Sequence, residues 1–255
     1  MAKDLKPVAL QLYSLRQTAA QDFFGVLKSV AAMGYAGVET AGLHNKTPQE
    51  VRKVVEDLGM KICSAHMALP TAETLQQTVD AVKGLGCTMI VNGRGSKDFD
   101  ALDKVKAHAE AYEAAIALLK PHGITVVYHN HWWEMNVLDG KLAYDELMRQ
   151  APNLKGELDV YWAANFGAQD PAKICARHKA RLPLLHIKDG PLVKDQPHTA
   201  VGAGKVDIAA CIAAADPKVL QWLIVELDAC ATDMATAVRE SYTYLTSRGL
   251  GKGRK

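Results

Sequence analysis

The sequence of 255 residues lacks the features that would place it among membrane or nucleic-acid-binding proteins. No apolar run is long enough to span a bilayer, and no signal peptide is recognisable. The formal net charge is only +2, with acidic and basic residues mixed throughout, so no dedicated nucleic-acid or membrane surface is expected. No linker-like or low-complexity segment and no internal sequence repeat divides the chain. A single domain over residues 1–255 is therefore expected.

Cysteine is scarce, and none of the cysteines has Cys-x-x-Cys spacing. Free cysteine behaves as a small hydrophobe, so buried or half-buried free thiols are expected. An odd number of cysteines without paired spacing favours a reducing compartment. The expected location is the cytoplasm, and a periplasmic location would require a leader ahead of Met1. The five residues are Cys63, Cys87, Cys175, Cys211 and Cys230.

What the chain does contain is eight short β-prone runs, each followed by a helical pattern. The apolar runs fit parallel strands that are buried on both faces. Eight strand–helix units in 255 residues predict an α/β fold of one (β/α)₈ barrel, the TIM barrel. Strands are expected over 8–12, 37–40, 61–66, 88–92, 124–129, 154–159, 184–187 and 222–226. Helices are expected over 23–33, 71–83, 98–120 and 234–247.

Some helix boundaries follow from the capping residues. Gly34 should end the first helix in the left-handed conformation. Residues 47–50, Thr-Pro-Gln-Glu, form a capping-box pattern with proline at the first helical position. Thr71 is expected to cap the helix that runs to about residue 83. The longest irregular stretch, 189–205, is expected to be a substrate loop on the active-site side.

Polar or charged residues lie at the ends of all eight predicted strands. The C-terminal strand ends of a (β/α)₈ barrel form its active site, so these residues are candidate site residues. Residues two apart on a strand share a face, which groups further residues with them. The strand ends carry Gln11, Ser14, Arg16, Glu39, His66, Asn92, His129, Asn130, His131, Asp159, His186, Lys188 and Glu226.

Four of these residues have the chemistry of a metal site. His129, Asp159, His186 and Glu226 end the fifth to eighth strands, which are neighbours in a barrel. Two imidazoles and two carboxylates suit Zn²⁺, Mn²⁺, Fe²⁺ or Co²⁺, and the sequence does not choose among these metals. A divalent metal cofactor is therefore expected.

Five other residues at or just beyond the strand ends are expected to contact substrate, and they are Glu39, His66, Asn92, His131 and Trp133. His66 could be a fifth ligand, a substrate contact or a packed histidine. Glu39 needs a functional role or a basic partner, because an ionised acid is costly to desolvate. Trp133 could shield the site or face a sugar ring, and Asn92 and His131 complete the expected substrate-binding set. Four further histidines are expected to be solvated, and they are His108, His122, His178 and His198.

Six segments together resemble the sugar phosphate isomerase/epimerase family, the xylose isomerase-like barrels. The resemblance spans nearly the whole chain, and its more specific parts are Tyr-His-Asn-His at 128–131 and His-Ile-Lys-Asp at 186–189. The other four segments are Gln-Leu-Tyr-Ser-Leu-Arg at 11–16, Leu-Asp-Val-Tyr-Trp at 158–162, Val-Gly-Ala-Gly at 201–204 and Val-Glu at 225–226.

The resemblance implies a metal held by residues from strands five to eight, here His129, Asp159, His186 and Glu226. His129 is a departure, because the family usually has glutamate there. In the family's epimerases two glutamates act as an acid/base pair, so the loss of one puts a two-glutamate epimerisation in doubt. The endonuclease branch is disfavoured, because Trp162 stands where that branch has a metal-binding histidine.

The resemblance and the residues together predict an enzyme that acts on a keto-sugar or related polyol. A metal would polarise the carbonyl, Glu226 would remove the adjacent proton, and Lys188 would stabilise the enediolate. The second acid/base group is left open among His129, His131, Glu134 and Lys188.

The expected reaction is isomerisation or epimerisation. A lyase or dehydratase that eliminates a β-substituent, for example from 3-keto-glycosides, is the alternative, because elimination needs one base and one acid. A non-catalytic sugar-binding barrel is the alternative of another class. The expected partner is a small carbohydrate, with no nucleic acid and no membrane, and a homo-oligomer is left open.

Overall fold

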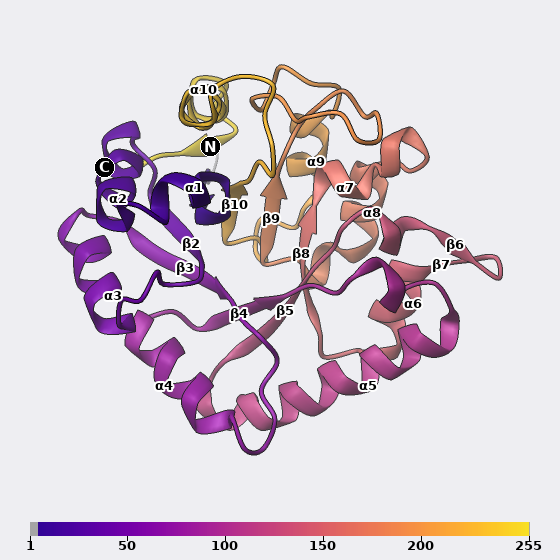
Figure 1. The fold of residues 1–255 in the computed structure, drawn as a ribbon. Coiled ribbons are helices and arrows are strands. Elements are labelled where there is room, and N and C mark those ends of the chain that lie inside the picture. The colour runs from indigo at the N-terminus through magenta and orange to yellow at the C-terminus, as the bar shows by residue number, and fades with distance from the viewer. Residues whose placement is uncertain (1–4, 255) are drawn as a thin grey trace.

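The computed structural model describes residues 5–254 and confirms the predicted (β/α)₈ barrel (Figure 1). Eight parallel strands follow in the order β1-β2-β3-β4-β5-β8-β9-β10, and β10 pairs with β1 to close the barrel. The barrel strands are β1 (Lys6–Gln11), β2 (Gly37–Ala41), β3 (Lys61–His66), β4 (Met89–Asn92), β5 (Thr125–His129), β8 (Lys155–Asp159), β9 (Leu184–Ile187) and β10 (Trp222–Val225).

Helices surround the barrel (Figure 1). They are α1 (Arg16–Ala19), α2 (Phe23–Met33), α3 (Pro48–Asp57), α4 (Leu75–Leu85), α5 (Leu102–Leu119), α6 (Ala143–Gln150), α7 (Val160–Ala163), α8 (Pro171–His178), α9 (Ile208–Ala214) and α10 (Met234–Ser247). A small hairpin, β6 (Val137–Leu138) with β7 (Lys141–Leu142), precedes α6, and β11 (Gly251–Lys252) pairs with the start of β1. Within 5–254, no helix is long and apolar enough to cross a membrane.

The predicted helix caps agree with the structure except at α4. Gly34 ends α2 with a φ of 101°, and the capping box of Thr47 and Glu50 is present at α3. At α4, however, the helix begins at Leu75, because Thr71 starts a turn in which its backbone N–H donates to Thr74 Oγ1 at 2.9 Å. The free thiols are confirmed, and Cys230 alone among the five is not fully buried.

The alternation of side chains along the strands divides the barrel interior into layers. One small apolar cluster fills the lower interior, separate from the large core between strands and helices. Two residues further along several strands, the next inward side chain is polar. The interior cluster consists of Ala9, Cys63, Met89, Val91, Val127, Leu184 and Ile224. The fold thus places a polar layer directly above an apolar floor, at the C-terminal ends of the strands.

The predicted loop 189–205 is ordered around one buried carboxylate, that of Asp189. Its two oxygens accept hydrogen bonds from the backbone N–H groups of Gly190, Gly202, Gly204 and Val206, at 2.8–3.1 Å. A Cβ at Gly204 would lie 2.1 Å from the carboxylate, so this glycine permits the close approach. A cavity opens at the C-terminal ends of the barrel strands, and the described residues that line it come from other segments than this loop.

Candidate metal centre and active-site cavity

A cavity of about 600 Å³ opens above the polar layer, at the C-terminal ends of the barrel strands. Its wall includes the strand-end residues Gln11, His66, Asn92, His129, His131 and Glu226, together with Tyr13, Arg94, Trp133 and Asp228. This is the end of the barrel at which active sites of the fold lie. The volume suits a small polar ligand.

Glu39, at the centre of β2, anchors one side of the polar layer. Its side chain is fully buried, and Gln11 Nε2 and Ser64 Oγ each donate to it at 2.5 Å. Its Oε1 also lies 2.9 Å from His66 Nε2 and 3.0 Å from His186 Nε2. Glu39 therefore positions two imidazoles and is sealed from the cavity.

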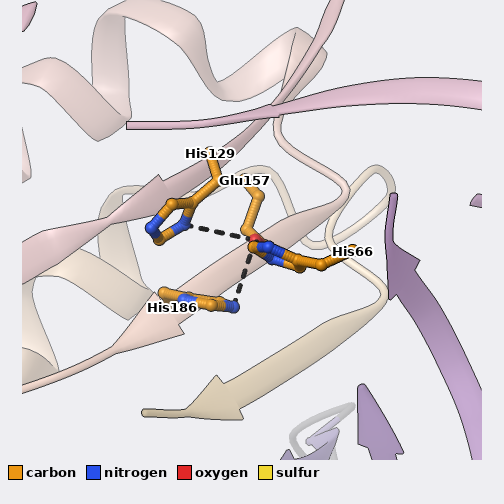
Figure 2. Close-up of side chains that lie close together, drawn as sticks. All are labelled: His66, His129, Glu157 and His186. Carbon is orange, nitrogen blue, oxygen red and sulfur yellow. Dashed lines mark hydrogen bonds and ion pairs between the residues drawn. The ribbon is translucent and has the colours of Figure 1, made fainter. Parts of the chain in front are cut away.

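Glu157, on β8, lies among three imidazoles (Figure 2). Its Oε2 is 3.3 Å from His66 Nε2, 3.3 Å from His129 Nδ1 and 3.1 Å from His186 Nε2. The side chain of Glu157 is fully buried, and within the described residues its Oε1 has no hydrogen-bond partner. A buried ionised oxygen without a partner is costly unless a cation compensates it.

Lys188 forms the second charged centre of the layer. Its fully buried ammonium lies 3.0 Å from Asp159 Oδ2, 2.8 Å from Glu226 Oε2 and 2.8 Å from Asp228 Oδ2. Asp159 also caps α7, because its Oδ1 accepts the backbone N–H of Trp162 at 2.9 Å. Three carboxylates thus surround one permanent cation.

The structure brings the four predicted metal-binding residues together. His129, Asp159, His186 and Glu226 each offer one ligand atom within 4.8 Å of the others, and all four side chains are buried. A second group meets the same test, and it consists of His66, His129, Glu157 and His186. The two groups share His129 and His186.

The donor set fits a divalent metal. Zinc holds nitrogen and oxygen ligands at about 2.0–2.2 Å, which sets neighbouring ligand atoms roughly 3.0–3.6 Å apart. The distances from Glu157 Oε2 to the three imidazole nitrogens fall in this range. His129 Nδ1 and Glu157 Oε1 lack hydrogen-bond partners within residues 5–254, as expected of atoms that face a cation.

The pKa values of the three imidazoles around Glu157 are shifted in different directions. Burial lowers the pKa of His129, so this imidazole is neutral at neutral pH. Burial alone would also lower the pKa of His66, but the carboxylates of Glu39 and Glu157 raise it to about 10. Burial alone would lower the pKa of His186 as well, but the carboxylates of Glu157 and Glu226 raise it well above its usual value.

Glu226 remains ionised in this setting. Burial alone would raise the pKa of its carboxyl group, but the charges of Lys188 and His186 hold that pKa well below its usual range. Only 5% of Glu226 is exposed, yet it lines the cavity.

Three other predicted residues occupy defined positions near the cavity. Trp133 lines it, stacks on His131 with ring centroids 4.2 Å apart, and donates its indole N–H to the carbonyl of Arg94. Asn92 also lines the cavity, but its amide donates to the carbonyl of Met67 and accepts from the hydroxyl of Tyr112.

Glu134 does not line the cavity. It is fully buried, and it accepts the Tyr128 hydroxyl at 2.5 Å and the His131 backbone N–H at 2.8 Å. In this arrangement its carboxylate fixes the turn after β5.

Sequence reasoning assigned no role to Glu157, although the alternation of side chains places it on the same face as Asp159. The register of the sheet supplies the missing information, because Glu157 pairs with His129 of β5 while Asp159 pairs with His186 of β9. Both carboxylates of β8 therefore reach the polar layer at neighbouring levels.

Two of the histidines expected to be solvated are buried instead. His178 packs on Tyr144 and lies with its Nε2 2.7 Å from Asp145 Oδ1. His198 lies under the rim of the barrel, where its Nδ1 accepts the backbone N–H of Asp228. The expectation failed because these partners are distant in sequence.

The fold and the site define a (β/α)₈ barrel with a His/Glu/Asp cluster that could bind a divalent metal. The family model described as "Xylose isomerase-like TIM barrel" matches residues 27–248, so the chain belongs to this family. A search of curated proteins found no match.

Solved structures of several enzymes are similar to this one. A sugar phosphate isomerase/epimerase from Parabacteroides distasonis has a TM-score of 0.79 at 25% identity, over 98% of this chain and 97% of that chain. The IOLI protein, solved with a zinc atom, has a TM-score of 0.75 at 11% identity, over 96% and 98%. The probable 3-DHS dehydratase AsbF from Bacillus anthracis has a TM-score of 0.74 at 15% identity, over 95% and 99%.

Proposed function

We propose that the protein is a divalent-metal-dependent isomerase or epimerase that acts on a keto-sugar or related polyol through an enediolate. The observation that carries the proposal is the cavity of about 600 Å³, whose floor is a buried cluster of imidazoles and carboxylates. The similarity to the Parabacteroides distasonis sugar phosphate isomerase/epimerase supports this class of reaction and a small carbohydrate substrate.

His129 and His186 would hold the metal, because they belong to both groups of ligand residues. The IOLI protein, which is similar in fold, was solved with a zinc atom, and this supports a divalent metal here. Zinc, manganese, cobalt and iron all remain candidates for this donor set. When bound, a divalent metal supplies a Lewis acid that polarises the substrate's carbonyl oxygen.

Glu226 is the proposed general base. It lines the cavity and is held ionised, so it can accept the proton from the carbon next to a substrate carbonyl. Lys188 does not reach the cavity wall and acts through Glu226, whose Oε2 lies 2.8 Å from its ammonium. Epimerisation is completed by a proton delivered to the opposite face of the same carbon by a second group, for which His131 at the cavity wall is a candidate. Isomerisation is completed when Glu226 returns the proton to the neighbouring carbon and the hydroxyl proton passes to the former carbonyl oxygen.

A keto-sugar lyase or dehydratase is the second candidate. Among the described residues that line the cavity, the carboxylates are Glu226 and Asp228, and both follow β10, whereas His66, His129 and His131 supply imidazoles from other strands. A base at one wall and an imidazole acid at another suit elimination, which needs one base and one acid. The similarity in fold to the dehydratase AsbF is compatible with this reaction.

Nuclear magnetic resonance in deuterated water tests both candidates. The zinc-, manganese- or cobalt-loaded protein would be incubated with free ketohexoses and with 3-keto-glycosides, with and without chelator. We expect about one metal per chain and deuterium at the carbon next to the carbonyl, with activity abolished by the chelator. A new sugar isomer identifies the isomerase or epimerase, and a released β-substituent identifies the lyase. Bound metal without exchange or turnover on the whole panel would contradict both candidates and favour a sugar-binding barrel.

A further inference from the structure

The two groups of residues that could hold the metal differ in the cation they already contain. In the group with Asp159 and Glu226, the fully buried ammonium of Lys188 lies 2.8–3.0 Å from both carboxylates. A divalent metal bound to the same oxygens would lie beside that ammonium, and like charges repel strongly away from water. Each carboxylate of this group therefore already has a cation as its partner.

The group with Glu157 contains no permanent cation, because imidazoles carry its positive charge and can give up their protons when they bind a metal. The ion-pair partners of Glu157 in the described chain are the imidazoles of His66, His129 and His186, and no lysine or arginine is among them. Its Oε1, His129 Nδ1 and Asp159 Oδ2 are buried without hydrogen-bond partners within residues 5–254, and of the three Asp159 Oδ2 has an ammonium 3.0 Å away. The Oε2 of Glu157 lies 3.1–3.3 Å from all three imidazole nitrogens, which is the spacing of ligand atoms around one ion.

The two ring nitrogens of His186 distinguish the groups further. Nε2 faces Glu157 Oε2 at 3.1 Å and Glu39 Oε1 at 3.0 Å, whereas Nδ1 faces Glu226 Oε2 at 3.2 Å. A histidine that binds metal through one nitrogen usually donates its other N–H to a carboxylate, which fixes the tautomer and orients the ring. Glu226 is placed to accept that bond if Nε2 is the ligand atom.

We propose that the metal binds His66, His129, Glu157 and His186, and that Asp159 and Glu226 serve as partners of Lys188 rather than as ligands. This inference rests on the metal dependence proposed above. It replaces the carboxylate pair implied by the family resemblance with a site of three imidazoles and one carboxylate. It also leaves Glu226 free to accept a proton.

Zinc affinity, measured by competition with a chromogenic chelator, tests the ligand set. Glu157→Gln and Asp159→Asn form a matched pair, because each replaces one buried carboxylate on β8 by an amide of the same shape. We expect Glu157→Gln and His66→Gln to raise the zinc dissociation constant at least about tenfold, and Asp159→Asn by less than about threefold. X-ray absorption at the zinc edge should count about three imidazoles in the wild type and about two in His66→Gln.

The outcomes separate this inference from the proposed function. A large loss in Asp159→Asn, or equal losses in Glu157→Gln and Asp159→Asn, would overturn the ligand set and leave a metal-dependent enzyme in place. A wild-type protein that binds no zinc, manganese or cobalt would overturn both. Circular dichroism of the metal-free variants checks folding, and His66→Gln provides a second test at a side chain that is 26% exposed should Glu157→Gln not fold.

Discussion

Glu226 is accessible to the cavity and in contact with a buried ammonium, and these two properties together suit a base that must stay ionised. The carboxylate Oε2 contacts both Lys188 Nζ and His186 Nδ1, so its charge is balanced by groups that face away from the ligand. A substrate entering the cavity would meet an oxygen that is already desolvated and fixed in direction. At the scale of single residues, this contact defines the chemistry that the barrel can perform.

Glu226→Gln should abolish proton abstraction while leaving metal binding within about threefold of wild type. The amide keeps the size of the side chain but cannot accept the proton, so exchange of the substrate's α-hydrogen with solvent deuterium should fall at least about 100-fold. Glu134→Gln is the comparison, because Glu134 faces Tyr128 and should retain exchange. Normal exchange in Glu226→Gln with loss in Glu134→Gln would assign the base to Glu134.

The sequence identifies the residues at the strand ends, but it does not show at which level of the barrel interior each side chain lies. His129, His186 and Glu226 follow recognisable strands, and their positions at the rim come from the fold alone. Glu157 lies inside its strand, and only the register with β5 reveals that it reaches His129. The position of the Lys188 side chain decides which carboxylates have an ammonium as their partner, and sequence spacing does not give that position.

At the scale of elements, the sequence predicts those helix boundaries that are set by interactions between residues close together in the chain. The capping box of α3 and the glycine that ends α2 involve residues within one turn, so the sequence contains the whole interaction. The hairpin of β6 and β7 has two residues per strand, too few for an alternating pattern. The burial of His178 depends on α6, which lies about thirty residues earlier.

The contact between α6 and α8 gives a pH-dependent prediction. Asp145 of α6 contacts His178 and Arg177 of α8. Burial alone would raise the pKa of Asp145, but these partners lower it below its ordinary value. The carboxylate therefore stabilises the fold above the unfolded-state pKa of about 4, and this stabilisation is lost as pH falls through the folded-state pKa.

Asp145→Asn should lower the free energy of unfolding by about 1 kcal/mol at neutral pH, a value reduced for partial exposure of the contact. The difference from wild type should shrink below about pH 4. Urea denaturation at several pH values measures it. Asp57→Asn, which removes an exposed ion pair with Lys53 within α3, should change the stability little at any pH. A constant difference across the pH range would refute the linkage.

At the scale of the whole molecule, the proposed ligands join distant parts of the barrel. His66 is on β3, His129 on β5, Glu157 on β8 and His186 on β9, so one ion would connect strands that are separated by more than a hundred residues of chain. The barrel is already closed by β10 and β1. Metal binding should therefore add to the stability of a formed barrel rather than create it.

Saturating zinc should raise the melting midpoint of the whole protein. At a free concentration of about 100 times the dissociation constant, binding contributes about 2.7 kcal/mol, which corresponds to roughly 5–10 °C for a chain of this size. His186→Ala should lose this shift, because His186 belongs to both ligand groups. His108→Ala, on α5, should keep it. The same zinc-induced shift in both variants would place the metal elsewhere.

The carboxylate of Asp189 determines how freely the loop that follows it can vary. It binds the backbone at both ends of its loop, at Gly190 and at Gly202, Gly204 and Val206. The backbone N–H groups of His198 and Thr199 also donate, to the carbonyls of Ala229 and Asp189, so residues 191–197 lie between two fixed points. Changes in their length or composition need not disturb the strands. Loop closure costs grow slowly with length, so insertions here are thermodynamically tolerable. Because the described residues that line the cavity come from other segments, such changes would leave the polar layer and the cavity wall unchanged.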